Sequence, residues 1–209
     1  MRQKVRWGVL GVAKIATAKV IPAMQRGLVS EVVAIASCDE GRAADAARSI
    51  GMAKAYGSYD ALLADADIDA VYIALPNHLH VPWSIRAAEA GKHVLCEKPI
   101  GLSAREAQDL LAVRDRTGVL IQEAFMVRTH PQWQAAKQLM SAGDVGEVRS
   151  MTGYFSYFND DPVNIRNIAA WGGGAVMDIG CYLIHTSRFI FGEEPVRVSS
   201  AIRSLARIA

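Results

Sequence analysis

The first 125 residues alternate short apolar runs with longer amphipathic ones, and this alternation constrains the fold more than any other feature. The run at 31–37 is rich in β-branched residues and predicts a buried strand. Strands and helices in alternation form a parallel sheet covered by helices on both faces, with right-handed crossovers. The sequence therefore predicts an α/β, doubly wound parallel sheet. Strands are expected at 4–10, 31–37, 54–56, 70–75, 93–96 and 119–122, and helices at 12–26, 43–50, 61–64, 81–90 and 103–117.

Beyond Phe125 the pattern changes, and the sequence predicts an incomplete α+β domain. A single strand cannot shield the apolar face of the helix expected at 175–191, so we expect most of this domain's sheet to be missing. We place the boundary between a first domain at 1–124 and a partial second domain at 125–209. The second domain is expected to hold helices at 131–142 and 175–191, strands at 148–158 and 196–201, and a loop at 159–170.

Charge and composition narrow the class of protein. The formal net charge is +2, from 23 basic and 21 acidic residues, and no basic block argues for nucleic acid as a partner. No uncharged apolar run reaches the roughly 18 residues that a membrane helix needs. The three cysteines lack paired or metal-type spacing, which suits a reducing compartment. We therefore expect a cytoplasmic protein with no metal site and no nucleic-acid or membrane partner.

A small-residue turn, GVLGVAKIA at 8–16, joins the first strand to the first helix. Such a turn lets the backbone approach a pyrophosphate, and the helix N-terminus offers free N–H groups. Ala13 stands where the dinucleotide fingerprint has a second glycine, so a turn without a ligand remains the alternative. We expect cofactor contacts from Gly8, Gly11, Val12, Ala13, Lys14 and Ile15.

The end of the second strand chooses between the two nicotinamide cofactors. An acid there binds the ribose 2′-hydroxyl and rejects a 2′-phosphate. Ser37 occupies that position, followed by Cys38, while Asp39 is placed to cap the next helix. A serine hydroxyl can hydrogen-bond a phosphate, although no arginine adjoins it and Arg42 is interpreted as a solvated helix residue. The tip therefore favours NADP over NAD, with Ser37 and Cys38 in contact with it.

Polar residues follow two further strands at the edge where ligands of this architecture bind. Lys98 ends one strand, partly desolvated and suited to proton transfer with a hydroxyl. Pairing with Glu97 is an equally good interpretation of this lysine, and a lone histidine such as His80 is more often structural. We expect cofactor contacts from Leu75, Pro76, Asn77, His80, Glu97 and Lys98.

The stretch at 171–185 is the most distinctive of the chain, because three glycines lead directly into an apolar helix. Asp178 and Tyr182 lie four residues apart and share one helix face, and His185 falls near it. A row of polar groups on an apolar helix is costly to bury without partners. A helix cap and a core tyrosine would explain single residues, but the three together indicate a substrate cleft.

These motifs together resemble the Gfo/Idh/MocA oxidoreductases, the family of glucose–fructose oxidoreductase and inositol 2-dehydrogenase. The resemblance rests on GVLGVAKIA at 8–16, PNHLH at 76–80, AGKHVLCEKP at 90–99, EAFMVRTHP at 123–131 and GGGAVMDIGCY at 172–182. It implies a Rossmann domain, a mixed α/β domain that often supports oligomers, and oxidation or reduction of a sugar or polyol by NAD(P). Family members are also much longer than this chain, which agrees with a truncated second domain.

The resemblance also implies site residues. By similarity Lys98 is the catalytic lysine. Tyr182, in place of the histidine of inositol dehydrogenases, indicates the branch of dimeric dihydrodiol dehydrogenase and NADP-dependent xylose dehydrogenase, and would be the general acid/base. Asp178 would position Lys98 or the substrate, and Arg128, Arg166 and His185 would contact substrate.

A close variant of this enzyme, an oxidoreductase that holds its cofactor tightly and couples two sugars, also fits the sequence. Two functions of other classes remain possible as well. The first is a truncated remnant that binds a dinucleotide without catalysis. The second is a different Rossmann protein such as a methyltransferase, which would leave Lys98 and Asp178–Tyr182 unexplained. A completed second domain would favour a homo-oligomer.

Overall fold

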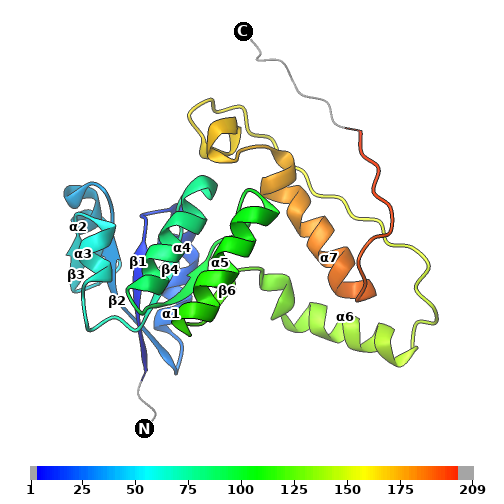
Figure 1. Cartoon of the computed structure of the whole chain (residues 1–209), viewed down its shortest axis with the longest axis horizontal. Helices are drawn as coiled ribbons and strands as arrows, with labels where there is room; N and C mark the ends of the chain where they lie inside the picture. Colours follow the sequence, from blue (N-terminus) through cyan, green and yellow to red (C-terminus); the bar gives the residue numbers. More distant parts are fainter. Residues whose placement is uncertain (1–3, 202–209) are drawn as a thin grey trace.

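The computed structural model describes residues 4–201 and is organised around one six-stranded sheet. All adjacent strands pair in parallel, in the order β3-β2-β1-β4-β5-β6. The carboxyl ends of the strands lie at the top edge in Figure 1. The predicted parallel sheet is confirmed. Its strands are β1 (Val5–Leu10), β2 (Ser30–Ala36), β3 (Lys54–Tyr56), β4 (Ala70–Ile73), β5 (His93–Cys96) and β6 (Ile121–Glu123).

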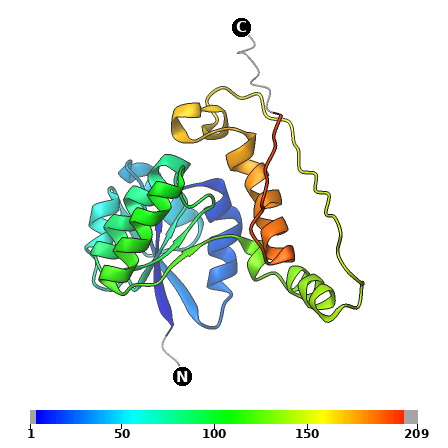
Figure 2. The same ribbon diagram turned by 45° about the vertical axis from the view of Figure 1, so that its right-hand side comes forward.

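Helices cover both faces of this sheet (Figure 2). Side chains alternate along each central strand, so Val9 packs in the cluster of Ile21 and Ala46 while Leu10 packs in that of Leu62 and Ala87. The first cluster lies under α1 and α2, and the second under α3 and α4, which makes the fold doubly wound. The helices are η1 (Ala16–Val20) continuing into α1 (Ile21–Gln25), then α2 (Glu40–Ser49), α3 (Tyr59–Leu63), α4 (His80–Glu89) and α5 (Ala104–Thr117).

The helix caps follow the sequence closely. The Asp39 carboxylate accepts a hydrogen bond from the Arg42 amide at 2.9 Å, and Ser103 Oγ accepts one from Glu106 N at 3.2 Å. Glu106 reaches back to Leu102 N rather than to the cap residue itself. These contacts satisfy amides that the first turn of a helix leaves free.

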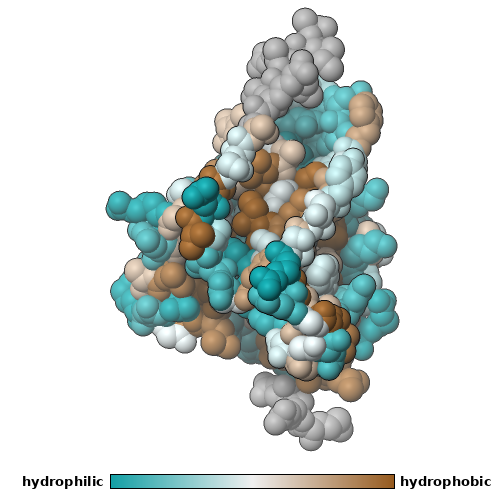
Figure 3. All heavy atoms as spheres, turned by 90° about the vertical axis from the view of Figure 1, so that its right-hand side faces the viewer, coloured by the Kyte–Doolittle hydropathy of each residue, from teal (hydrophilic) through white to brown (hydrophobic). Residues whose placement is uncertain are grey.

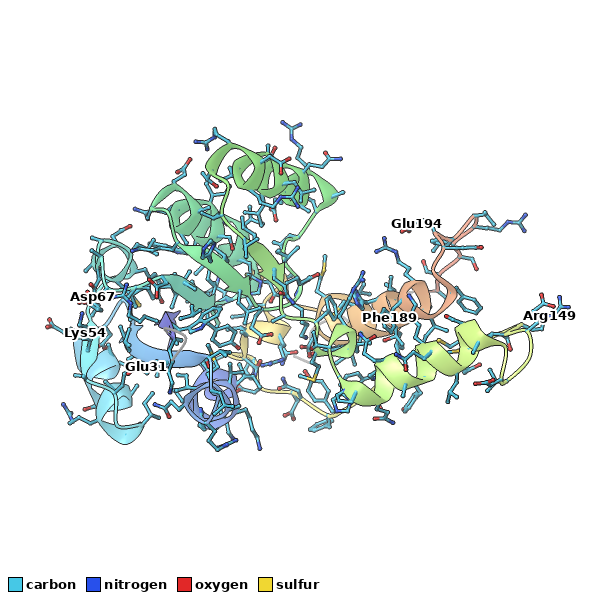
Figure 4. All side chains as sticks on the ribbon, turned by 90° about the horizontal axis from the view of Figure 1, so that it is seen from below. Glu31, Lys54, Asp67, Arg149, Phe189 and Glu194 are labelled. Carbon is cyan, nitrogen blue, oxygen red and sulfur yellow. The ribbon has the colours of Figure 1, made fainter. Side chains whose placement is uncertain are left out.

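A network of charges lies at the amino-terminal ends of the strands, on the side of the sheet opposite their carboxyl ends. Lys54 Nζ lies 2.8 Å from Asp65 and 3.0 Å from Asp67, and Figure 4 shows Lys54 and Asp67 close together. Hydrogen bonds from Lys54 and Tyr56 hold the pKa of Asp65 well below its usual range. Arg6 pairs with Asp69 in the same way at 2.8 Å. This network is structural, because it lies far from the carboxyl ends of the strands.

The second region, residues 126–201, contains the two long helices that the sequence predicts, and both are confirmed. They are α6 (Pro131–Ala142) and α7 (Cys181–Phe191). A π-helical turn, η6 (Val176–Gly180), leads directly into α7, so the chain is helical from 175 to 191 as predicted. The loop expected at 159–170 holds two short turns, and short turns also follow β4 and β6. They are η2 (Asn77–Leu79), η3 (Met126–Arg128), η4 (Ile165–Asn167) and η5 (Ala169–Trp171).

The strands predicted at 148–158 and 196–201 are wrong. Within the part of the chain that the structure describes, neither segment has a neighbouring strand to pair with, and a strand needs a partner for its backbone groups. The alternation at 148–158 is nevertheless real. An added Cβ on Gly153 would lie 2.7 Å from Leu183 of α7, and the Phe155 ring lies 5.8 Å from that of Tyr182.

Apolar side chains on the outward side of this region are exposed, and Figure 3 shows hydrophobic residues gathered on that side of the molecule. Tyr154 and Phe158 are 89% and 85% exposed. Aromatic residues normally bury most of their surface, so this stretch has the pattern of a strand without the sheet that would cover it.

Candidate functional site

A cavity of about 570 Å³ opens at the carboxyl ends of the central strands. This is the position where ligands bind in doubly wound sheets, and the volume falls within the range of small-molecule sites. Residues 165–173 of the second region form part of its wall and lie above the top edge of the sheet in Figure 1. The wall includes Gly11, Val12, Ala13, Lys14, Ile15, Ser37, Cys38, Leu75, Pro76, Asn77, His80, Glu97, Lys98, Arg166 and Asp178.

The glycine turn forms the floor of the cavity. Gly11 has φ +99°, and an added Cβ there would lie 2.6 Å from the carbonyl oxygen of Ala74. The chain becomes helical at Lys14, so the amides of this first turn have no carbonyl of their own helix to bind. Gly8, in contrast, lies outside the cavity. It sits inside β1, where an added Cβ would meet Leu62 at 2.6 Å, so this glycine makes room for core packing.

Ser37, Cys38, Arg42 and Tyr59 line one end of the cavity. Ser37 Oγ accepts a hydrogen bond from the Asp39 amide at 3.2 Å. Arg42, interpreted from the sequence as a solvated helix residue, lies on the cavity wall. The Asp39 carboxylate caps α2 and is not part of this wall.

Asn77 and His80 use their side chains within the protein. Asn77 Nδ2 donates to the carbonyl of Gly172 at 2.9 Å and so ties the β4 edge of the cavity to residues 165–173. The buried His80 ring lies 2.7 Å from the carbonyl oxygen of Pro99 and 2.8 Å from that of Leu75. Burial lowers the pKa of His80, against the effect of the two carbonyls. Both residues line the cavity, but these contacts show that they hold its wall together.

The far end of the cavity brings together Lys98 and Asp178, which lie 80 residues apart in the sequence. Lys98 Nζ donates to the carbonyl oxygen of Asp178 at 2.5 Å and lies 3.4 Å from its carboxylate. Arg166 Nε donates to the same carboxylate at 3.2 Å, and the hydroxyl of Tyr157 donates to its other oxygen. Burial raises the pKa of Asp178. Contacts with Tyr157, Lys98 and Arg166 lower the same pKa by more, so the net shift is downward.

Tyr182 does not line the cavity. It lies beside this cluster and contacts Lys98 through its ring. Lys98 Nζ is 4.8 Å from the ring centroid, and Phe125 packs edge-on against the same ring at 5.4 Å. Burial, followed by the negative charge of Glu97, raises the pKa of Tyr182 to about 12. The side chain is therefore a protonated phenol at neutral pH.

Arg128 and His185, the other two expected substrate residues, lie outside this cavity. The His185 ring stacks on Phe125 at 4.1 Å, and burial lowers its pKa. Arg128 lies 5.8 Å from the ring of Phe189, which Figure 4 places between α6 and α7. Arg128 is exposed and His185 is partly buried against Phe125, so the contact of either residue with substrate stays a prediction.

Sequence reasoning missed Arg42, Tyr59 and Trp171 as cavity residues, and Tyr157 as a partner of Asp178. Trp171 directly precedes the three glycines, which was the available signal. The position of Tyr59 depends on how α3 packs, and no local pattern announces it.

Comparison with known proteins agrees with this geometry. Residues 5–125 match the model of the oxidoreductase family with an NAD-binding Rossmann fold, and residues 133–208 match the Gfo/Idh/MocA C-terminal domain. The chain belongs to the Gfo/Idh/MocA oxidoreductase family. As a member of it, the chain carries the predicted Rossmann-type nucleotide-binding fold followed by part of the family's second domain.

Several members of the Gfo/Idh/MocA family are similar over most of this chain. It is 55% identical to an uncharacterized oxidoreductase of Rhizobium meliloti, over 93% of this chain and 58% of that protein. It is 46% identical to a D-xylose 1-dehydrogenase (NADP(+)) of Haloferax volcanii, over 89% and 57%. A crystal structure of a 3-ketoreductase from Actinomadura kijaniata with NADP and TDP-benzene has a TM-score of 0.85 and 39% identity, over 90% and 58%. The chain thus spans less than two thirds of the length of these relatives.

A trans-1,2-dihydrobenzene-1,2-diol dehydrogenase of Mus musculus is 32% identical over 95% of this chain and 60% of that protein. The matches therefore include both enzymes of the branch that the Tyr182 motif indicates. Within residues 4–201, no helix has the length and apolarity needed to cross a membrane. The same residues contain no group of three His, Cys, Asp or Glu side chains placed to hold a metal ion.

Proposed function

We propose that this protein transfers a hydride between NADP(H) and the hydroxyl or keto carbon of a sugar, a polyol or a related cyclic diol. One observation carries the proposal: a single cavity joins the glycine turn to Lys98 and Asp178. The named relatives support it, since they include a xylose dehydrogenase, a 3-ketoreductase and a dihydrodiol dehydrogenase. Domains at 1–124 and 125–209 are part of this proposal.

The cavity residues fit a nicotinamide dinucleotide. The close approach of Gly11 to Ala74 leaves the first turn of the helix open to a pyrophosphate, whose charge suits free backbone amides. Lys98 and Asp178 lie at the opposite end of the same cavity, where the reacting ring would lie. The bound cofactor supplies the hydride donor or acceptor, while the protein supplies position and electrostatics.

The end formed by Ser37 and Arg42 supports a preference for NADP. A hydroxyl and a guanidinium suit a 2′-phosphate, and arginine binds phosphate with several donors at once. Asp39 is committed to the cap of α2, so its carboxylate does not oppose the phosphate.

The proton chemistry falls to Lys98 and Tyr182. Two of the ammonium hydrogens of Lys98 face Asp178, which leaves the third to hold the substrate oxygen. A phenol whose pKa is raised to about 12 donates a proton readily only to a more basic oxygen. In the reducing direction the carbonyl carbon gains a hydride as its oxygen gains the proton of Tyr182, and oxidation reverses both transfers. Arg166 lines the cavity near Lys98 and Asp178. Of the three residues predicted to contact substrate, it is the one that the geometry favours.

A second candidate function is dinucleotide binding without turnover. The exposed aromatic side chains of Tyr154 and Phe158 support it, because no strand within residues 4–201 covers them. In a protein with that sheet complete, we propose a homo-oligomer built on it.

Titration of the purified chain with NADPH and NADH tests the proposal, with energy transfer from tryptophan to the reduced nicotinamide as the signal. We expect NADPH to bind more tightly, and Trp171→Phe to remove a large part of the transfer because Trp171 lines the cavity. Arg42→Ala should weaken NADPH alone. Preference for NADH would contradict the reading of Ser37 and Arg42, and binding of neither would contradict the proposed function.

A substrate screen then separates the two candidates. We expect aldose, polyol and diol substrates to oxidise NADPH or reduce NADP in the wild type, and Lys98→Ala to lose this turnover by roughly 100-fold or more, the range typical of acid–base groups. Tight NADPH binding with no turnover on any substrate would favour the binding protein.

A further inference from the structure

Tyr157 lies on the exposed, extended stretch at 148–158 and differs from its aromatic neighbours in the direction of its side chain. Its neighbours Tyr154 and Phe158 turn outward, whereas Tyr157 turns toward η6 and donates its hydroxyl hydrogen to Asp178 Oδ2. Partial burial, followed by the hydrogen bond to Asp178 and the negative charge of that carboxylate, raises the pKa of Tyr157, so the phenol stays protonated and remains a donor.

This contact decides how the Asp178 carboxylate is shared. Oδ1 lies 3.2 Å from Arg166 Nε and 3.4 Å from Lys98 Nζ, so two cations compete for one oxygen. Arginine and carboxylate groups prefer a bidentate pair that uses both oxygens. The hydroxyl of Tyr157 competes with Arg166 for Oδ2, and it holds the carboxylate in the orientation that keeps Oδ1 toward Lys98.

The consequence falls on Lys98. Its ammonium is held by the Asp178 carbonyl oxygen, by Oδ1 and by the face of the Tyr182 ring. The Lys98 and Asp178 side chains are only 13% and 14% exposed, so water competes weakly for the contact. A carboxylate that turned to Arg166 would leave the ammonium with the carbonyl oxygen and the ring alone.

We infer that Tyr157 is a positioning residue, which holds Asp178 Oδ2 and thereby keeps Oδ1 shared with the Lys98 ammonium. This inference rests on the proposed function only in assigning Lys98 to the substrate oxygen. The hydrogen-bond network itself is testable without any turnover.

The test is the rate at which Lys98 is acylated by a small amine-reactive reagent at fixed pH. The rate is resolved by mass spectrometry of the Lys98 peptide and divided by that of Lys137. Loss of a carboxylate partner frees the amine. We expect Tyr157→Phe to raise the Lys98 rate about three-fold, because the variant weakens one of several contacts of the ammonium and does not remove the carboxylate. Asp178→Asn should raise it at least as much. Tyr154→Phe is the matched control, because it removes a hydroxyl from the same stretch without touching Asp178, and should change nothing.

A double variant separates positioning from general loosening. Arg166→Gln removes the competing cation, so adding Tyr157→Phe to it should leave the Lys98 rate unchanged. A structural disturbance would raise the rate in both backgrounds, and that result would overturn the inference. It would also be overturned if Tyr157→Phe labelled like the wild type while Asp178→Asn did not, or if Asp178→Asn itself had no effect.

Two further measurements distinguish this inference from misfolding of a variant and from failure of the proposed function. Circular dichroism checks that each variant is folded. If Tyr157→Phe is not folded, Tyr157→Leu serves as a second variant that lacks the hydroxyl donor. The NADPH titration is run beside the labelling. If the wild type binds no cofactor, the proposed function fails, while the labelling result still decides whether Tyr157 controls Asp178.

Discussion

Residues 5–123 and residues 126–201 differ sharply in how much they bury. Almost all of the fully buried apolar side chains belong to the first region, whereas beyond Phe125 the buried side chains of the described chain are Val127, Thr186 and Phe189. The first region closes its strands with helices on both faces, and the second has two helices and an extended stretch with no sheet. The proposed chemistry nevertheless needs both, because Lys98 belongs to one and Asp178 to the other. We therefore expect most of the folding stability to come from the first region, whereas the proposed chemistry depends on both.

The largest expected effect tests this difference in packing. Leu10 is fully buried between strands and helices, and Leu139 of α6 is about half exposed. Leu10→Ala should cost about 2–5 kcal/mol of the free energy of unfolding, from lost burial and the cavity left behind. Leu139→Ala should cost less than about 1 kcal/mol. Urea denaturation measures both. Equal losses would show that the second region is as tightly packed as the first.

The next effect compares two glycines of positive φ. Gly11→Ala places a Cβ 2.6 Å from a backbone carbonyl, whereas Gly143, at the end of α6, has φ +80° and open space around it. We expect about 1–2 kcal/mol for Gly143→Ala, from its left-handed backbone alone. Gly11→Ala adds a clash that only backbone movement relieves, and should also weaken NADPH binding. Thermal unfolding and the NADPH titration check this. Unchanged cofactor affinity would mean that the turn does not meet the pyrophosphate.

A smaller effect concerns the contact between the two regions. Asn77→Ala removes the hydrogen bond to Gly172 but leaves both packed bodies intact. We expect little change in unfolding free energy, about 1 kcal/mol or less. The dissociation of NADPH should become several-fold faster, because residues 165–173 would be held less firmly over the cavity. Stopped-flow displacement measures the rate, and Asn167→Ala, within the same segment but away from Asn77, is the control. An unchanged rate would show that this hydrogen bond does not retain the cofactor.

The smallest effect is the pH dependence of stability. Burial lowers the pKa of both His80 and His185, so each contributes stability that is present above the unfolded pKa of about 6.5 and lost as pH falls toward the folded pKa. His80 is fully buried and His185 only half buried, so His80 should dominate. Between pH 7.5 and 5.5 we expect a decrease in unfolding free energy that His80→Asn reduces more than His185→Asn does. The reverse order would mean that the second region is better shielded from water than its exposure suggests.

Much of this was predictable from the sequence, because local patterns determine the first region. The helix ends at Asp39 and Ser103 and all six parallel strands follow from caps and apolar runs. The strand predicted at 148–158 is absent from the structure, because alternation sets which side chains face α7 but cannot supply a partner strand. The cavity residues were largely predictable because strand ends meet at one edge of a parallel sheet. Arg42 is exposed, as expected of a solvated helix residue, and it also lines the cavity. Its place on the wall was not predictable, because it depends on the angle at which the helix leaves its strand.

The hydrogen bond between Asn77 and Gly172 spans 95 residues of sequence. A chain leaving the ribosome exposes the whole sheet and its glycine turn well before Gly172 is made, and domains generally fold as units in that order. The floor of the cavity can therefore be assembled while the wall at 165–173 does not yet exist. The order of synthesis thus gives the nascent chain a stage at which the carboxyl edge of the sheet has formed without residues 165–173 beside it.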